Sequence, residues 1–160
     1  MHSGKILKTL TNSMYVGGTI YEPQTIDRVI FLSSDDIFVE FKDSYTFNFS
    51  KYSKSGSTDL NDGIYSGTSN KLKISVNFVY QWINADYVPR YNLEVVKNNV
   101  VDKRRSLGIN DTYLDENIIN ERFVINVQSG NKIEIRISKD NEASNFMRIE
   151  GNAYLEFEAF

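Results

Sequence analysis

The sequence predicts an all-β protein, a two-sheet antiparallel jelly-roll sandwich preceded by a short N-terminal arm. The first reason is that apolar residues recur at every second position over most of the chain, which is the period of half-buried strands. The second is that about nine such segments follow one another at short spacing, as in sandwiches and barrels. The third is that this many strands in one domain of 160 residues fit a jelly roll better than a small closed barrel.

The N-terminal part is expected to divide into an arm, residues 1–25, and the start of a single β-sandwich domain, residues 26–160. Met1–Leu10 is expected to be a short helix or part of the arm, because three of its apolar residues share one helical face. The next alternating or apolar runs predict the first strands of the sandwich. These runs are Val29–Leu32, Ile37–Phe41 and Tyr45–Phe49.

The middle of the chain contains the clearest strand. Between Leu72 and Tyr80 every second residue is apolar and the residues between them are mostly polar. Ser50–Asn70 is rich in Ser, Gly, Asn and Asp, and we expect a long loop there. Tyr91–Val95 predicts another strand that ends in a turn at Asn98-Asn99, since Asn tolerates the left-handed backbone region.

The C-terminal part predicts a hairpin and the closing strands. Phe123–Val127 and Ile133–Ile137 alternate strictly and are joined by Gln128–Asn131, so they form the strongest hairpin prediction of the chain. Leu114–Ile119 is the only stretch besides the N-terminus that suggests a helical turn. The last strands are Phe146–Ile149 and Ala153–Glu158, separated by a Gly151-Asn152 turn.

The composition excludes most catalytic chemistry. There is no Cys, and His2 is the only His, so thiolate metal sites, cysteine nucleophiles and Ser-His-Asp triads are absent. Asp59–Gly63 has some likeness to a calcium loop, but it lacks the closing Glu; a surface loop is the favoured interpretation and calcium the alternative. No pair of carboxylates is marked as a glycosidase site. We therefore expect no enzyme, no cofactor and no catalytic residue.

The charge argues against nucleic acid as a partner, and the distribution of apolar residues argues against a membrane. The net charge of −3 and the pI of about 5.2 do not suit a phosphate backbone. The one basic run, Lys103-Arg104-Arg105, is interpreted as a solvated loop. No apolar run reaches the roughly 20 residues of a membrane span, and no secretory signal is visible. We therefore expect neither nucleic-acid binding nor membrane insertion.

The ten Tyr, ten Phe and one Trp permit two interpretations. The favoured one is a sandwich core, and the alternative is a patch that packs subunits together or stacks on sugar rings. Trp82, with Tyr87, is the candidate ligand contact because it ends a strand beside a polar loop. The candidates for the core or a trimer interface are Phe78, Tyr80, Tyr154, Phe157 and Phe160.

Residues 63–160 resemble the C1q/TNF-like jelly roll, including the head domains of phage and viral fibres of that class. The segments that carry the resemblance are Leu72–Phe78 after Gly63-Ile64-Tyr65, Tyr91–Asn98, Phe123–Arg136 and Asn152–Phe157. Two positions depart from the family pattern, with Asn99 in place of Gly and Asn131 in place of Asp. These departures affect hairpin details rather than the fold.

The resemblance implies a compact homotrimer that buries apolar surface along a three-fold axis, without catalytic residues. Absence of Cys and of a signal peptide, and a composition rich in Asn, Ile, Lys and Tyr, suggest the viral side of the family. We therefore expect a phage virion protein, a fibre head, head fibre or decoration module. Residues 1–25 would attach it to other particle proteins, and its head would contact the host, including a surface glycan. The alternative is a bacterial surface or secreted carbohydrate-binding sandwich.

Overall fold

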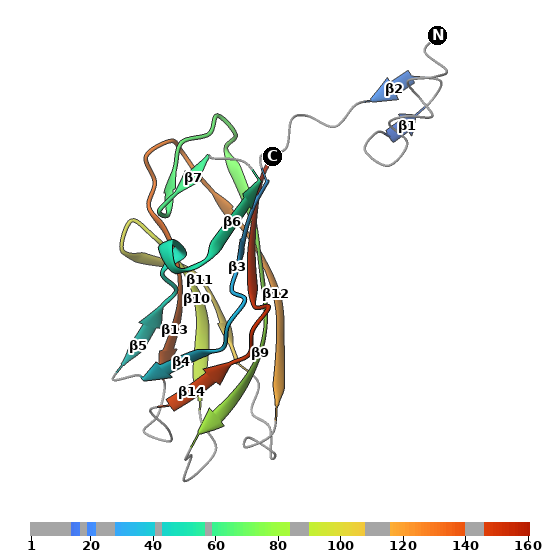
Figure 1. Cartoon of the computed structure of the whole chain (residues 1–160). Coiled ribbons are helices and arrows are strands. Elements are labelled where there is room, and N and C mark those ends of the chain that lie inside the picture. The colour runs from blue at the N-terminus through green and yellow to red at the C-terminus, as the bar shows by residue number, and fades with distance from the viewer. Residues whose placement is uncertain are drawn as a thin grey trace.

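The computed structural model describes residues 28–40, 43–56, 59–83, 90–107, 116–139 and 146–160. It also gives the backbone of a small antiparallel hairpin, β1 (Met14–Val16) and β2 (Thr19–Tyr21). The regular structure of the described residues is almost entirely β-strand, and most of the strands form two facing antiparallel sheets (Figure 1). The predicted all-β, two-sheet jelly-roll sandwich is therefore confirmed. The division at residue 25 and the helix at Met1–Leu10 fall outside these residues.

The larger sheet is built around one long strand, β9. The strand β14 pairs with the C-terminal half of β9 and β15 pairs with its N-terminal half, so β14 and β15 lie end to end along one side of β9. In the next row β4 pairs with β14, and β3 pairs with β15. β6 pairs with β3, and β12 pairs with β9 along the edge opposite to β14 and β15. Their bounds are β3 (Arg28–Leu32), β4 (Ile37–Glu40), β6 (Ser53–Gly56), β9 (Lys71–Ile83), β12 (Asn117–Asn126), β14 (Phe146–Ile149) and β15 (Tyr154–Ala159).

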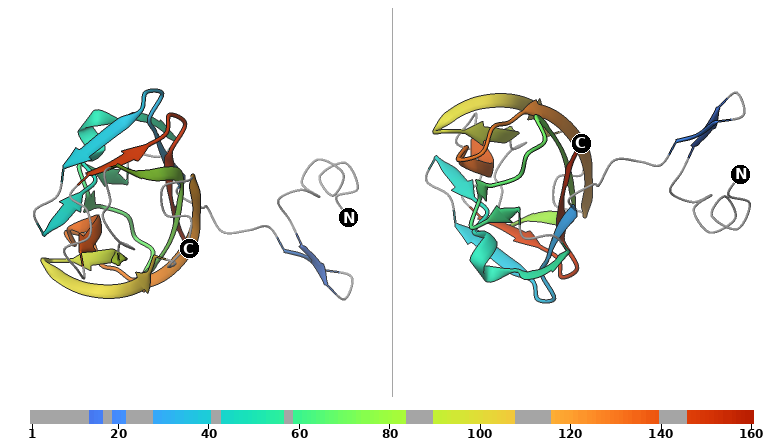
Figure 2. Two further views of the ribbon diagram at one scale, coloured as in Figure 1. Left: turned by 90° about the horizontal axis from the view of Figure 1, so that it is seen from below. Right: turned by 90° about the horizontal axis from the view of Figure 1, so that it is seen from above.

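The smaller sheet has the order β11-β10-β13-β5, with every pair antiparallel. Figure 2 views the sandwich along its strands, and the yellow β10 and β11 lie across the molecule from the blue and cyan β3 and β4. A short hairpin of β7 and β8 lies outside both sheets. The bounds are β5 (Ser44–Thr46), β7 (Leu60–Asn61), β8 (Ile64–Tyr65), β10 (Tyr91–Lys97), β11 (Val100–Ser106) and β13 (Ile133–Lys139).

The turn at Asn98-Asn99 is confirmed as the link of a two-residue hairpin between β10 and β11. Both residues have positive φ, 51° and 66°. Two successive positive φ values are the mark of a type I′ turn, whose twist matches that of the flanking strands. The Asn that stands in place of the family's Gly therefore keeps the turn.

The strongest hairpin prediction is wrong. β12 pairs with β9 in the larger sheet, whereas β13 pairs with β10 and β5 in the smaller one. The turn itself exists, with Gly130 at φ 93°, but it carries the chain from one sheet to the other. Alternation shows which face of a strand is buried, and it does not identify the strand's partner.

Three local expectations also change. The supposed loop over Ser50–Asn70 contains β6, β7 and β8. The strand predicted to reach Phe49 stops at Thr46, and a 3₁₀ turn, η1 (Phe49–Lys51), follows. The cause is Asn48, whose Oδ1 accepts hydrogen bonds from the backbone N and Oγ of Ser50 and so caps the turn. The helix predicted over Leu114–Ile119 is instead strand from Asn117 onward.

Candidate assembly face

The two sheets enclose a core rich in aromatic and β-branched residues. On β9 every second side chain from Leu72 to Trp82 is buried, which confirms the clearest predicted strand. The side chains between them therefore point away from the core, onto the outer face of the larger sheet. The strand register extends this face sideways, because Asn77 lies between Asn120 of β12 and Tyr154 of β15.

This outer face carries most of the exposed apolar surface. Among the described residues nine large hydrophobic side chains are exposed. Two of them, Ile64 and Val100, lie elsewhere. The other seven each follow or precede a buried residue of the larger sheet, and we call the face they share the assembly face. They are Leu32, Phe38, Ile118, Val124, Phe146, Tyr154 and Phe160.

Many of the charged groups of the assembly face are paired with one another. Arg28 donates to Glu156, and Lys73 Nζ lies 3.4 Å from Glu158 Oε2. Arg148 is surrounded by three carboxylates, those of Asp36 and Glu150 at 3.5 Å and that of Glu116 at 3.7 Å. A hydrogen bond between the Glu150 and Glu116 carboxyls raises the pKa of Glu150. The face therefore neutralises most of its own charge.

The outer face of the smaller sheet is different, because a buried carboxylate organises it. Glu94 on β10 is fully buried between β11 and β13. Arg104 donates to its Oε1 from Nε (3.0 Å) and Nη2 (2.7 Å), and Arg136 Nε donates to Oε2 at 2.7 Å. Ser138 Oγ also donates to Oε1 at 2.7 Å. Burial alone would raise the pKa of Glu94, but these hydrogen bonds outweigh it and lower the pKa.

The predicted core or interface residues separate into two groups. Phe78, Tyr80 and Phe157 are buried in the core of the sandwich, where Phe78 and Tyr80 contact each other edge to face. Tyr154 and Phe160 are exposed and belong to the assembly face. Sequence reasoning missed the other five members of that face. Their common signal is an apolar residue at the polar phase of an alternating strand, as at Phe38 between Ile37 and Val39 and at Ile118 beside Ile119.

The interpretation of Trp82 as an exposed ligand contact does not agree with the structure. Its side chain is only 5% exposed. The indole stacks on the ring of Tyr91 with centroids 4.1 Å apart and contacts Tyr80 at 5.4 Å. The alternation of β9 runs one step further than predicted, and this step takes Trp82 into the core. Tyr87, its proposed companion, lies outside the described residues.

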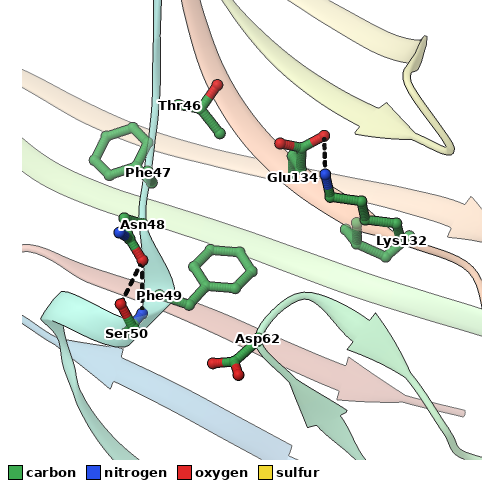
Figure 3. Close-up of a pocket in the computed structure, with 9 residues that line it drawn as sticks. Thr46, Phe47, Asn48, Phe49, Ser50, Asp62, Lys132 and Glu134 are labelled. Atoms are coloured by element: carbon green, nitrogen blue, oxygen red, sulfur yellow. Dashed lines mark hydrogen bonds and ion pairs between the residues drawn. The ribbon is translucent and has the colours of Figure 1, made fainter.

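One pocket of about 430 Å³ lies beside the end of β5 and the start of β13 (Figure 3). Several of its polar side chains form hydrogen bonds or ion pairs with one another. Lys132 Nζ lies 3.5 Å from Glu134 Oε1, and Asn48 is occupied with Ser50. Asp62, from the segment Asp59–Gly63 that has some likeness to a calcium loop, has φ 48° in the turn between β7 and β8. Within the described ranges no group of three or more His, Cys, Asp or Glu side chains has the arrangement to hold a metal ion.

No helix in the part of the chain that the structure describes is long and apolar enough to cross a membrane. The helical content described is the single short turn η1.

The fold is similar to that of several solved structures. Murine APRIL has a TM-score of 0.54 at 8% identity, over 85% of this chain and 100% of the other. VP2 of infectious bursal disease virus scores 0.48 at 12% identity, over 91% of this chain and 35% of the other. The globular domain of zebrafish complement 1qA has a TM-score of 0.43 at 14% identity, over 84% of this chain and 95% of the other. No family model matches the sequence, and neither does any curated protein. The likeness to murine APRIL supports the jelly-roll fold and no function.

Proposed function

We propose that this chain is a non-enzymatic structural module that self-associates through the assembly face. One observation carries the proposal: seven of the nine exposed large apolar side chains among the described residues lie on one face of one sheet. Scattered apolar residues are normal on a protein surface, but their concentration on a single face is typical of an interaction site.

A second copy of the chain fits this face better than a charged partner does. Its ion pairs are internal, so it offers no strong field of one sign to attract an acidic or basic surface.

The area of the assembly face is also sufficient for a stable interface. At about 3.3 Å per residue and about 4.8 Å between strands, the 13 residues of β9 and four strand rows span roughly 43 by 19 Å, or about 800 Å². A standard interface takes about 800 Å² from each partner.

The finer part of the proposal concerns the number of subunits and the setting. The resemblance of residues 63–160 to the C1q/TNF-like class favours a homotrimer around a three-fold axis. The same resemblance, with a sequence that has no Cys and is rich in Asn, Ile, Lys and Tyr, favours a phage or viral particle. In this proposal the chain is a fibre-head, head-fibre or decoration module of the virion, and residues 1–25 attach it to other particle proteins.

The oligomeric state tests the assembly. Native mass spectrometry and light scattering at micromolar concentration should give a trimer. Ile118→Arg places an unpaired charge in the interface formed by the assembly face. The substitution should weaken association at least tenfold, because a tenfold loss of affinity corresponds to only about 1.4 kcal/mol. Val100→Arg is the matched control, since Val100 is an equally exposed aliphatic residue (68% against 78%) on an edge strand of the other sheet.

A strictly monomeric wild type would overturn the assembly proposal, and so would equal dissociation of both variants. A stable dimer would keep the face but refute the trimer. The setting has its own test. Proteomic analysis of purified virus particles from the source organism should find this chain, and its absence from them would refute the virion placement.

A further inference from the structure

A second pocket lies at the open edge of the sandwich, where the edge strands of the two sheets meet. It is bounded by the β3–β4 connection, the start of β4, the strand β5 and the end of η1, and its volume is about 330 Å³. That volume is within the range of small-molecule sites, roughly 300–1,000 Å³. The side chains that give it chemical character are Asp35, Asp36, Phe38, Tyr45, Lys51 and Tyr52.

Two aromatic side chains, Phe38 and Tyr45, line this edge pocket. Phe38 is 70% exposed and stands on β4, the edge strand of the larger sheet that pairs with β14. Tyr45 is half-buried, and its ring contacts that of Phe47 with centroids 5.3 Å apart. Flat apolar surfaces held in place by strands are suited to packing against the C–H face of a ring-shaped ligand.

The pocket also has polar groups without partners. Within the described residues the Asp35 carboxylate and the Lys51 ammonium make no hydrogen bond or ion pair, so both are available to a ligand, one as an acceptor and one as a donor. The Tyr52 hydroxyl is buried and has no hydrogen-bond partner in that part of the chain. Buried hydroxyls normally have a partner.

The connection that forms the back of the pocket is held rigidly. Ser33 N donates to Ala153 O at 3.0 Å, and Asn152 N donates to Ser33 O at 2.6 Å. Gly151 N donates to Asp36 Oδ1 at 2.8 Å. A rigid wall reduces the ordering cost of binding, which is the meaning of a pre-organised site.

The charges select the kind of ligand. Asp35, Asp36 and the Glu116 and Glu150 carboxylates around Arg148 outnumber the two cations, Lys51 and Arg148, so an anionic ligand would meet net repulsion. The Asp36 carboxylate is also engaged by Gly151 N and Arg148, which leaves Asp35 as the available acceptor. An aromatic wall with one acceptor and one donor suits a neutral ring that carries several hydroxyl groups.

We propose that this edge pocket binds a neutral saccharide, with one sugar ring packed on Phe38 and Tyr45. Asp35 accepts a hydrogen bond from a sugar hydroxyl, and Lys51 donates one to a sugar oxygen. The site goes beyond the assembly role and does not depend on it. Because Phe38 also belongs to the assembly face, the bound sugar lies at the rim of that face.

A glycan array with neutral and acidic oligosaccharides, followed by NMR titration of the best binder, tests the site. The wild type should bind neutral glycans in preference to sialylated or sulfated ones. Phe38→Ala and Asp35→Asn should each weaken binding at least tenfold. Phe146→Ala is the matched control, since Phe146 is another exposed Phe on the same face and does not line the pocket; its affinity should stay within twofold of the wild type.

Three results would overturn the proposal: no neutral glycan bound by the wild type, a preference for acidic glycans, or binding that survives Phe38→Ala. The fluorescence of buried Trp82 reports whether each variant is folded, and mass measurement reports its subunit number. A variant that loses the sugar but keeps its subunit number separates this site from the assembly face. A wild type that is monomeric and still binds the neutral glycan would refute the proposed function alone.

Discussion

Replacement of Glu94 by Gln should destabilise the protein strongly, although this residue lies on the outer face of a sheet. The wild-type carboxylate is fully buried and accepts hydrogen bonds from Arg104, Arg136 and Ser138. Gln has nearly the same shape, but it carries no charge and turns an N–H₂ group toward one of the guanidinium groups. The substitution therefore leaves two arginines without their counter-charge while it changes the packing very little.

The expected loss can be estimated from these contacts. Breaking one side of a buried ion pair costs about 3–5 kcal/mol. Arg104 and Arg136 are 57% and 30% exposed, so water can solvate their head groups again after the substitution. We therefore expect the lower end, about 3 kcal/mol. For a chain of this length each kcal/mol lowers Tm by about 2–4 °C, so the melting temperature should fall by roughly 6–12 °C.

Denaturant unfolding followed by Trp82 fluorescence measures this loss at fixed protein concentration. The matched control is Glu134→Gln on the neighbouring strand β13. Glu134 makes one partly exposed ion pair, with Lys132 at 3.5 Å, and its loss should cost less than about 1 kcal/mol. If both variants lost the same small amount of stability, the organising role of Glu94 would be refuted.

The pH dependence gives an independent check of the same carboxylate. Folding lowers the pKa of Glu94, so its stabilising effect is complete above the ordinary carboxyl pKa of the unfolded chain. The effect is lost as the pH falls through the lowered pKa of the folded state. The difference in stability between wild type and Glu94→Gln should therefore be constant near neutral pH and shrink below about pH 4. A difference that grew with acidification would contradict this assignment.

Two further predictions compare paired sites by thermal unfolding. Tyr52→Phe removes a buried hydroxyl that has no hydrogen-bond partner among the described residues, and it should leave stability unchanged or raised by up to about 1 kcal/mol. Tyr65→Phe breaks a 3.1 Å hydrogen bond to a carbonyl and should cost about 1 kcal/mol. Equal losses would disprove the difference. Gly63→Ala should cost more than Gly130→Ala: both have positive φ, but only at Gly63 would the new Cβ meet a backbone oxygen, that of Ile133, at 2.7 Å. The reverse order would be inconsistent with this geometry.

Local patterns in the sequence predicted the strands and many of the turns. The alternation from Leu72 onward predicted β9 because one face of that strand is buried along its whole length. Asn98-Asn99 predicted the β10–β11 turn because few residues tolerate two positive φ values in succession. Such features depend on neighbours within a few residues, so they can be read from the chain itself.

The candidate sites were much less predictable. The sequence predicted that Tyr154 and Phe160 of the assembly face belong to the core or an interface. Alternation alone could not separate them from the core residues Phe78 and Phe157. Trp82 is an aromatic residue at the end of a predicted strand and was therefore a candidate ligand contact, but its ring is buried against that of Tyr91. The edge pocket joins segments from both sheets, and no sequence pattern brings those segments together.

The sequence by itself determined that this protein is a β-sandwich, which face of several strands is buried, and that the chain has no Cys and a single His. Only the tertiary structure decided that β12 and β13 belong to different sheets, that Glu94 is clamped between two arginines, and that exposed apolar side chains from separate strands share one face. The physical reason is that burial of a strand face leaves its mark every second residue. Strand pairing depends on contacts between residues far apart in the chain, and many different pairings satisfy the same alternation.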